Sequence, residues 1–370
     1  MSSTSHLGRP ALRAVAAAMA LIALAACGNN ATASNDSKDG ASDASGTPGE
    51  NGGTIPAGEP DVNGDGDVVI GVLSPGDLND NGFYESFVVK AQEVADDNGW
   101  ELIKVGSINP ADALEQARNL CRQGVDMVAL AAAELADAIP ASEEDVCADT
   151  AWYVPSSAGS IEVTDRITMS ADFINESLLA AGYAMGLLME ESGATKAGFV
   201  TGPEADFSIA AASAYQAGIR EVVPDAEVIS TYTGDFNDSA LAVEATTAQL
   251  NQSVGSLYPY LGGATDAAAQ VAFDAGIPVA TPGTDRCGEN TFAVSVVFDP
   301  GEYFAAALEE FAAGELAMGA VREWHLGVDA VPTVVLCSGT AEQEQQLADF
   351  ITSVGDGTID PDAVVERNGK

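Results

Sequence analysis

Short apolar runs alternate with longer amphipathic segments along most of this chain. The first run is Val68–Leu73, and apolar residues at helical spacing follow it over Phe83–Asp97. A continuous apolar run of this length is typical of a parallel strand that is buried on both faces. The same order of strand and helix recurs, so the sequence predicts an α/β protein whose parallel sheets are flanked by helices.

The predicted elements fall into two groups. The first group contains strands at 68–73, 100–105, 126–130 and 151–155, with helices at 83–97, 110–122 and 134–147. The second contains helices at 174–191, 206–222, 239–251 and 265–275, with strands at 196–201, 227–233, 254–260 and 277–281. Segments 292–298, 302–313 and 333–337 must complete one group or the other. We therefore expect two lobes, residues 67–168 with 292–325 and residues 169–291 with 326–368.

Two such lobes imply a ligand site between them. In open α/β sheets the ligand lies beyond the carboxyl ends of the strands. The informative segments are the loops after the predicted strands, at 74–84, 131–134, 202–207, 233–238, 260–266 and 281–287.

The first thirty residues predict export. Arg9 and Arg13 precede the apolar run Ala14–Ala26, which is shorter than the roughly 20 residues of a membrane span. The run ends in Leu-Ala-Ala followed by Cys27, which resembles a bacterial lipobox. That resemblance implies removal of residues 1–26 as a signal peptide and lipidation of Cys27; an ordinary signal peptide with an incidental cysteine is the alternative. Residues 27–66 have almost no large apolar side chain and predict a disordered tether.

The end of this tether resembles half of a calcium-binding loop. Asp61, Asn63 and Asp65 stand at the first, third and fifth positions, and glycine follows at the sixth. The twelfth position is Val72 where glutamate is needed, and no helix precedes the loop. An acidic linker is the default interpretation, and calcium binding is left open.

Composition excludes several classes of function. The chain has 14 Lys and Arg against 56 Asp and Glu, a net charge of −42, which opposes binding to nucleic acid. Its two histidines, His6 and His325, leave almost no material for a zinc site or a Ser-His-Asp triad. A Gly-x-Ser-x-Gly motif is also missing, which counts against an exported hydrolase. We expect no catalysis, no cofactor and no metal.

Four cysteines follow Cys27, an even number that suggests two disulfides in an exported chain. Three pairings are possible. We favour the pairing of Cys121 with Cys147 and of Cys287 with Cys337, because each disulfide would then close a loop within one region of the chain.

Five motifs in these segments resemble one family. They are Asp80-Asn81-Gly82-Phe83 and the segments 176–184, 198–202, 232–238 and 295–297. In this order they resemble the basic membrane protein family, which comprises exported, usually lipidated receptors of ABC importers with a type I periplasmic-binding-protein fold. Several members bind purine nucleosides. The resemblance implies a two-lobed receptor without enzymatic activity, an ABC permease as partner and a nucleoside or related small ligand.

Some departures from the family fall at ligand-contacting positions. Tyr84 stands where the family has an asparagine. The family has two acidic residues in the segment that corresponds to 283–286, and this chain has only Asp285. Phe298 stands at about the position of a family lysine. These departures weaken the prediction of a nucleoside. Segment 79–99 also resembles pentose and hexose receptors, so a sugar receptor remains an alternative, as does a tethered sensor without a transporter.

The candidate ligand-contacting residues come from the loops after the strands. Phe83 and Phe207, at the starts of two helices, are predicted to stack on a flat ligand, with helix packing as the alternative. Asp80, Asp238 and Asp285 can accept hydrogen bonds from hydroxyls or amines, and Asp238 alternatively caps a helix. The remaining candidates are Tyr84, Tyr260 and Gly262.

Overall fold

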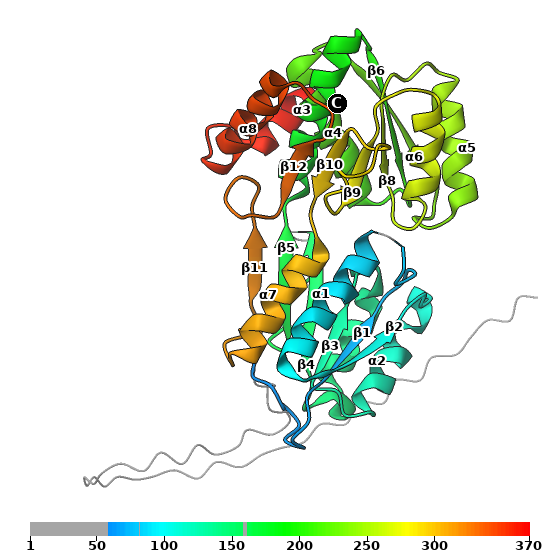
Figure 1. The fold of residues 1–370 in the computed structure, drawn as a ribbon. Helices are drawn as coiled ribbons and strands as arrows, with labels where there is room; N and C mark the ends of the chain where they lie inside the picture. The colour runs from blue at the N-terminus through cyan, green and yellow to red at the C-terminus, as the bar shows by residue number, and fades with distance from the viewer. Residues whose placement is uncertain (1–57, 81, 158–160) are drawn as a thin grey trace, which may run out of the picture. The chain divides into compact units, whose positions relative to one another are not determined.

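The structure is a computed structural model that describes residues 58–80, 82–157 and 161–370. The predicted signal peptide and Cys27 lie outside the described residues. The described residues form two α/β lobes with parallel sheets flanked by helices, as the sequence predicted (Figure 1). Within them, no helix is both long and apolar enough to cross a bilayer.

The first lobe contains a parallel six-stranded sheet in the order β11-β5-β4-β3-β1-β2. Its strands are β1 (Val69–Leu73), β2 (Glu101–Val105), β3 (Met127–Leu130), β4 (Ala151–Ser157), β5 (Ile167–Asp172) and β11 (Val321–Trp324). Strand β1 lies between β2 and β3, where Ile70 pairs with both Leu102 and Met127. Because β1 and β3 are buried on both faces, they read as continuous apolar runs.

Helices cover both faces of this sheet. Helices α1 (Phe83–Asn98) and α7 (Pro300–Ala312) pack side by side on one face (Figure 1). Aromatic rings of these helices pack against the sheet. The ring centroids of Phe87 and Phe304 are 4.4 Å apart, and those of Phe304 and Tyr153, in β4, are 4.7 Å apart. The neighbouring Trp152 points to the opposite face. That face is covered by α2 (Ala113–Cys121) and the 3-10 helices η1 (Pro110–Asp112), η2 (Ala133–Glu143) and η3 (Asp145–Cys147).

The second lobe is built on two three-stranded sheets, β7-β6-β8 and β12-β10-β9. A parallel bridge between Leu257 and Val279 joins them. Strand β12 is antiparallel to β10, and the other pairs are parallel. The strands are β6 (Lys196–Thr201), β7 (Glu227–Tyr232), β8 (Leu257–Tyr260), β9 (Ala280–Gly283), β10 (Val294–Val297) and β12 (Thr333–Leu336).

Six helices flank the second lobe's sheets. Helices α3 (Ile174–Ser192), α4 (Asp206–Val222), α8 (Ala341–Gly355) and α9 (Pro361–Asn368) share one core. Helices α5 (Ser239–Leu250) and α6 (Thr265–Asp274) cover the other face. Helices α3 and α4 pack closely because both carry glycine where they meet. A β-carbon at Gly182 would lie 2.0 Å from the carbonyl oxygen of Tyr215, and one at Gly218 2.0 Å from that of Leu179.

The chain crosses between the lobes three times, and the crossings differ from the boundaries expected from the sequence. Strand β5 continues the first sheet to Asp172, past the expected boundary at 168. The expected assignment of 292–325 to the first lobe fails for β10, because Val294 pairs with Ala280 of β9 and the strand is buried on both faces. Helix α7 and strand β11 do belong to the first lobe.

Two further expectations need correction. The segment expected as a helix over 134–147 forms the 3-10 helices η2 and η3, since Pro140 lies inside it and cannot donate a backbone hydrogen bond. The described end of the predicted tether makes defined contacts instead of being disordered. Asn63 donates from Nδ2 to the carbonyl of Gly124 at 2.7 Å, and Leu316 N donates to the carbonyl of Gly58 at 3.2 Å.

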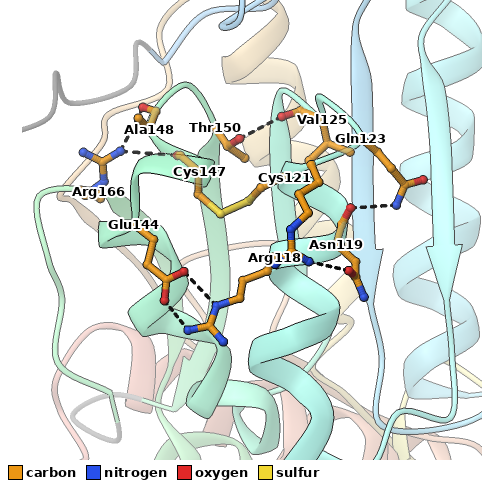
Figure 2. Close-up of a disulfide and its surroundings, with 11 residues drawn as sticks. Arg118, Asn119, Cys121, Gln123, Val125, Glu144, Cys147, Ala148, Thr150 and Arg166 are labelled. Atoms are coloured by element: carbon orange, nitrogen blue, oxygen red, sulfur yellow. Dashed lines mark hydrogen bonds and ion pairs between the residues drawn. A yellow bond between two sulfur atoms is a disulfide. The ribbon is translucent and has the colours of Figure 1, made fainter.

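Two disulfides link the four described cysteines in the pairing that the sequence favoured. Figure 2 shows Cys121 at the end of α2 joined to Cys147 of η3. Nearby, Arg118 donates to Glu144 from Nε at 2.8 Å and from Nη2 at 2.5 Å. Closing a loop of this length stabilises a chain by on the order of 3 kcal/mol. The second disulfide, Cys287–Cys337, joins the loop after β9 to the end of β12.

Candidate ligand-binding site

A cavity of about 370 Å³ is lined by residues of both lobes. Its size falls in the range of about 300–1,000 Å³ that is usual for small-molecule sites. The first lobe contributes the start of α1, the segment after β3, the ends of β4 and β5, and the start of α7. The second lobe contributes the starts of α3 and α4 and the ends of β8, β9 and β10. The cavity therefore lies at the carboxyl ends of strands in both lobes, where the fold predicts a ligand.

Aromatic rings dominate the wall of this cavity. The ring centroids of Phe83 and Phe298 are 6.4 Å apart, and those of Phe298 and Tyr260 are 6.1 Å apart. Phe207 and Phe236 form a second pair at 6.0 Å with nearly parallel planes. Both lobes contribute rings, and an aromatic face can stack on a flat ligand. The aromatic residues in the wall are Phe83, Tyr84, Phe207, Phe236, Tyr260, Phe298 and Tyr303.

Five of the residues predicted from sequence lie in this wall: Phe83, Tyr84, Phe207, Tyr260 and Gly262. Phe83 and Phe207 are half-buried at the starts of α1 and α4, so each ring keeps surface toward the cavity. Tyr84 is buried, and its ring packs against Gly76, where a β-carbon would lie 2.2 Å from the ring.

Gly262 brings the second lobe close to Tyr84. A β-carbon at this position would lie 2.9 Å from Asn237 Oδ1 and 3.5 Å from the ring of Tyr84. The next residue, Gly263, donates its backbone N–H to Asn237 Oδ1 at 2.8 Å. The lack of a side chain therefore allows the loop after β8 to approach the first lobe at the edge of the cavity.

The three predicted aspartates lie outside the wall, and their carboxylates accept hydrogen bonds from backbone N–H groups instead. Asp80 accepts hydrogen bonds from the N–H groups of Gly82, Tyr84 and Glu85 at 3.0–3.3 Å, and burial raises the pKa of its carboxyl despite these bonds. It thereby fixes the start of α1 and the rings of Phe83 and Tyr84.

The other two aspartates have similar backbone roles. Asp238 caps α5 by accepting from Ala240 N at 2.9 Å and Leu241 N at 3.1 Å, which is the alternative that the sequence left open. Asp285 accepts from the N–H of Cys287 at 3.0 Å, beside the second disulfide.

The carboxylates in the wall are Glu134 and Asp172, and neither was predicted as a ligand contact. Glu134 begins η2 in the loop after β3, which the sequence did mark as informative. Asp172 ends β5, a strand that the hydrophobic pattern did not predict, so the loop after it was not considered. Phe236 and Tyr303 were also missed, although Phe236 lies within the 232–238 motif.

Tyr84 and Glu134 form a hydrogen-bonded pair in the wall. The Tyr84 hydroxyl donates to the Glu134 carboxylate. Glu134 has surface open to the cavity, yet protein surrounds it closely, and this loss of solvent raises its pKa above the usual value. Burial and the charge of Glu134 together hold the pKa of Tyr84 well above 10. The hydroxyl is therefore a permanent donor at neutral pH.

Two hydroxyls in the wall lack protein partners. Ser177 and Tyr303 are only 2% and 4% exposed, and neither hydroxyl has a hydrogen-bond partner among the described residues. Buried polar groups are normally paired. These two hydroxyls are therefore available to a ligand that fills the cavity.

No group of three or more His, Cys, Asp or Glu side chains among the described residues is arranged to hold an ion. In the segment that resembles half of a calcium loop, Asp61 Oδ1 accepts from Gly66 N at 3.1 Å and Asn63 Oδ1 accepts from Asp65 N at 2.9 Å. Its side-chain oxygens thus hold the turn itself.

Comparison with known proteins gives the same architecture. A solute-binding protein of an ABC transporter system from Conexibacter woesei DSM 14684 is 19% identical, with a TM-score of 0.61 over 79% of this chain and 98% of that chain. One from Aeropyrum pernix K1 is 16% identical, with a TM-score of 0.65 over 82% and 90%. The arabinose-transporter binding protein of Shewanella sp. ANA-3 is 17% identical, with a TM-score of 0.54 over 81% and 98%. No curated protein sequence matches significantly.

The family is shown by a sequence model that covers most of the chain. The model for PnrA-like ABC transporter substrate-binding proteins, called Bmp, matches residues 67–352. This is the family that the five motifs resemble, and its members are substrate-binding proteins of transporters, not enzymes. The chain belongs to the Bmp family of PnrA-like ABC transporter substrate-binding proteins.

Proposed function

We propose that the cavity binds a nucleoside or a related small molecule that contains a flat base. The observation that carries this proposal is the set of aromatic rings from both lobes around a cavity of about 370 Å³. A base offers two apolar faces for stacking, and stacking on aromatic side chains is favourable for every base. Phe83 in the first lobe and Phe207 in the second are the residues best placed for this contact.

The polar groups in the wall suit a ligand with few hydrogen-bonding positions. Besides the tyrosine hydroxyls, the polar side chains are Glu134, Ser170, Asp172 and Ser177. A free sugar carries a hydroxyl on nearly every carbon, and each hydroxyl that is buried without a partner costs about 1–3 kcal/mol. A nucleoside buries a larger apolar surface for a similar number of polar groups.

A sugar is the second candidate, and one observation favours it. Solved structures of the same fold include a binding protein from Burkholderia graminis C4D1M in complex with D-arabinose and the Shewanella protein bound to L-arabinofuranose. At 15% and 17% identity these structures show the fold, and the sugars that they hold are the reason for the second candidate.

Cys27 is the proposed point of attachment to the membrane. Substrate-binding proteins of ABC importers work outside the cytoplasm, and a lipid on Cys27 would keep this one beside its permease. The Leu-Ala-Ala-Cys run behind two arginines supports this part of the proposal. A tethered sensor that binds the same ligand without a transporter is the competing arrangement.

Recovery of the bound ligand tests the proposal. The protein is purified without added ligand and denatured, and the released small molecules are identified by mass spectrometry. Calorimetry with nucleosides, free bases and pentoses then measures the affinity of each class. A nucleoside or base that binds at least about tenfold more tightly than any pentose supports the proposal. A pentose that binds more tightly than every nucleoside overturns it in favour of the second candidate.

A further inference from the structure

The charges in the cavity wall constrain the ligand more than the shape of the cavity does. Glu134 and Asp172 are both carboxylates, and no lysine, arginine or histidine of the described chain lies in the wall. The cationic side chains lie elsewhere: Arg286 pairs with Asp266 and Glu289, and Lys90 pairs with Glu302 on the first lobe. Among the described residues, the wall therefore contains two carboxylates and no basic side chain.

The two carboxylates line the same cavity as the ring of Tyr260. Glu134 comes from the segment after β3 and Asp172 from the end of β5, both in the first lobe. Tyr260 comes from the end of β8 in the second lobe. Burial raises the pKa of Tyr260, and the charges of Asp172 and Glu134 raise it further. Both carboxylates thus lie within electrostatic reach of a single hydroxyl where the lobes meet.

A neutral ligand would leave the charge of Glu134 poorly compensated. When a ligand fills the cavity and expels water, Glu134 loses solvation, and a charge removed from water is costly unless it is paired. The hydrogen bond from Tyr84 compensates Glu134 only in part, because it is a single neutral donor. A positively charged ligand would replace the lost solvation directly.

The aromatic rings favour the same kind of ligand. The face of an aromatic ring carries a negative potential that attracts cations within about 6 Å of its centre. Phe83, Phe298 and Tyr260 form a continuous series of rings with centroids 6.1–6.4 Å apart, and Tyr260 is the ring that both carboxylates influence. A flat cation in this position would meet aromatic faces and carboxylates together.

From these features we infer that the ligand carries a positive charge on its ring system, as a cationic nucleoside or base does. The inference rests on the proposed function, because it takes the stacked base as given and specifies its charge. Glu134 is the residue assigned to the charge, with the ring of Tyr260 beside it.

Isomeric nucleosides separate charge from size. 1-Methyladenosine is a cation near neutral pH, whereas N6-methyladenosine has the same number of methyl groups and is neutral. 3-Methylcytidine and 5-methylcytidine form a second pair, in which the first is a cation and the second is neutral at the same pH, with the charge on a pyrimidine ring. Calorimetry at pH 7 is expected to show tighter binding of the cation in each pair, by at least about tenfold. Raising the salt concentration should narrow the difference.

Two charge-matched variants locate the effect. Glu134→Gln removes the carboxylate from the wall and should reduce the preference for the cation to less than about threefold, while the neutral isomers lose little affinity. Asp137→Asn is the control, because Asp137 lies on the same 3-10 helix, is exposed and does not line the cavity. It should retain the preference of the parent. Thermal melting without ligand verifies that both variants are folded.

The outcomes separate the inference from the proposed function. Equal affinity within both pairs, with measurable binding of all four nucleosides, overturns the inference and leaves the proposed function standing. Undetectable binding of all four overturns both. A cation preference that survives Glu134→Gln also overturns the inference, since a group other than Glu134 would then recognise the charge of the ligand.

Discussion

Asp80 and Phe83 show how one loop residue places another. The Asp80 carboxylate accepts three backbone N–H groups at the start of α1, so the helix begins at Phe83 with a fixed orientation. The Phe83 ring then lies edge-on to Tyr84 at 5.4 Å and near Phe298 at 6.4 Å. The side chain is half-buried and lines the cavity, so its removal should affect binding more than folding.

Phe83→Ala should weaken ligand binding by roughly 1–3 kcal/mol, or about 5- to 150-fold, because one stacking face is lost. Calorimetry with the recovered ligand measures this change, and thermal melting without ligand measures stability. Phe273→Ala is the control, since Phe273 lies on α6, is 42% exposed and does not line the cavity. Unchanged affinity in Phe83→Ala would mean that this ring only packs the helix start.

His325 lies where the chain passes from β11 back to the second lobe. Its Nδ1 is 2.9 Å from Glu176 Oε1, and the other oxygen of Glu176 accepts from Leu326 N at 2.9 Å. The ring of Phe173 stacks on the imidazole at 4.3 Å. Burial lowers the pKa of His325, but the hydrogen bond to Glu176 and the charges of Glu176 and Glu323 outweigh burial, so its pKa lies above 6.5.

Stability should therefore fall as pH rises through this pKa. The folded state binds the His325 proton more tightly than the unfolded state, so the pair stabilises the fold fully below about pH 6.5 and ceases to do so above the folded pKa. His325→Gln should lose less stability than the parent between about pH 6 and 8.5. Urea denaturation at both pH values measures the difference. The effect should be small, because the side chain is 35% exposed. A parallel decrease in both proteins would contradict this assignment.

At the scale of elements, the crossing of α3 and α4 depends on two glycines. The backbone of each helix occupies the space where the other would carry a β-carbon, as at Gly182 and Gly218. Gly186, one turn further along α3, is less tightly enclosed: a β-carbon there would lie 3.0 Å from Cβ of Val222 and 3.1 Å from the carbonyl oxygen of Ile219. Backbone cannot move aside as a side chain can, so the three positions should differ in tolerance.

Gly218→Ala should destabilise the fold by about 1–3 kcal/mol or more, as overpacking of a rigid contact does. Gly186→Ala should cost less, because its β-carbon would meet neighbours at 3.0 Å and 3.1 Å, whereas the one at Gly218 would lie 2.0 Å from a carbonyl oxygen. Urea denaturation of the two variants gives the comparison. Equal stabilities would show that α3 and α4 can separate without penalty, against the close packing described above.

The sequence predicted elements well where burial and helix signals coincide. Strand β6 and helix α4 have the predicted bounds, since a buried apolar run and a long amphipathic segment are both unambiguous. Strand β11 was not predicted, because three of its four residues are exposed, two of them charged, at the edge of the sheet. An edge strand of this kind has no hydrophobic pattern to read.

The site was predictable only in part, for a related reason. Phe83 stands out as a large ring at the start of a helix, and Tyr260 as a large ring at the end of a predicted strand. Glu134 does not stand out, because it is one of 56 acidic residues and its role depends on which cavity the 3-10 helix faces. Asp172 was further hidden by the missed strand β5.

At the scale of the whole molecule, ligand binding should be coupled to the arrangement of the lobes. Rings from both lobes line one cavity, and three crossings of the chain connect the lobes near residues 173, 299 and 325. At one crossing Ser86 Oγ donates to Asp299, which also caps α7 by accepting from Gly301 N at 2.9 Å. A ligand held by both lobes favours whichever arrangement brings its contacts together.

Cys27→Ser should release the protein from the membrane. The lipid attached to Cys27 is the proposed link to the bilayer, and no described helix is long and apolar enough to replace it. Fractionation of cells that express parent and variant measures the share of protein in the membrane. The variant should move to the soluble extracytoplasmic fraction with unchanged ligand affinity. A variant that remains with membranes as the parent does would rule out the lipid at Cys27.

The path of the chain also sets an order of assembly. Strands β1 to β5 come first, but α7, which covers one face of their sheet with Phe304 and Phe311, follows nearly all of the second lobe's strands. A ribosome that has made residues 58–172 has therefore made an incomplete core, and the second lobe likewise waits for β12, α8 and α9. The first lobe can therefore be completed only after β11 has been made, and the second only after α9. A chain that stops before α7 would leave both lobes unfinished, whereas a chain that stops after β11 would leave only the second lobe incomplete.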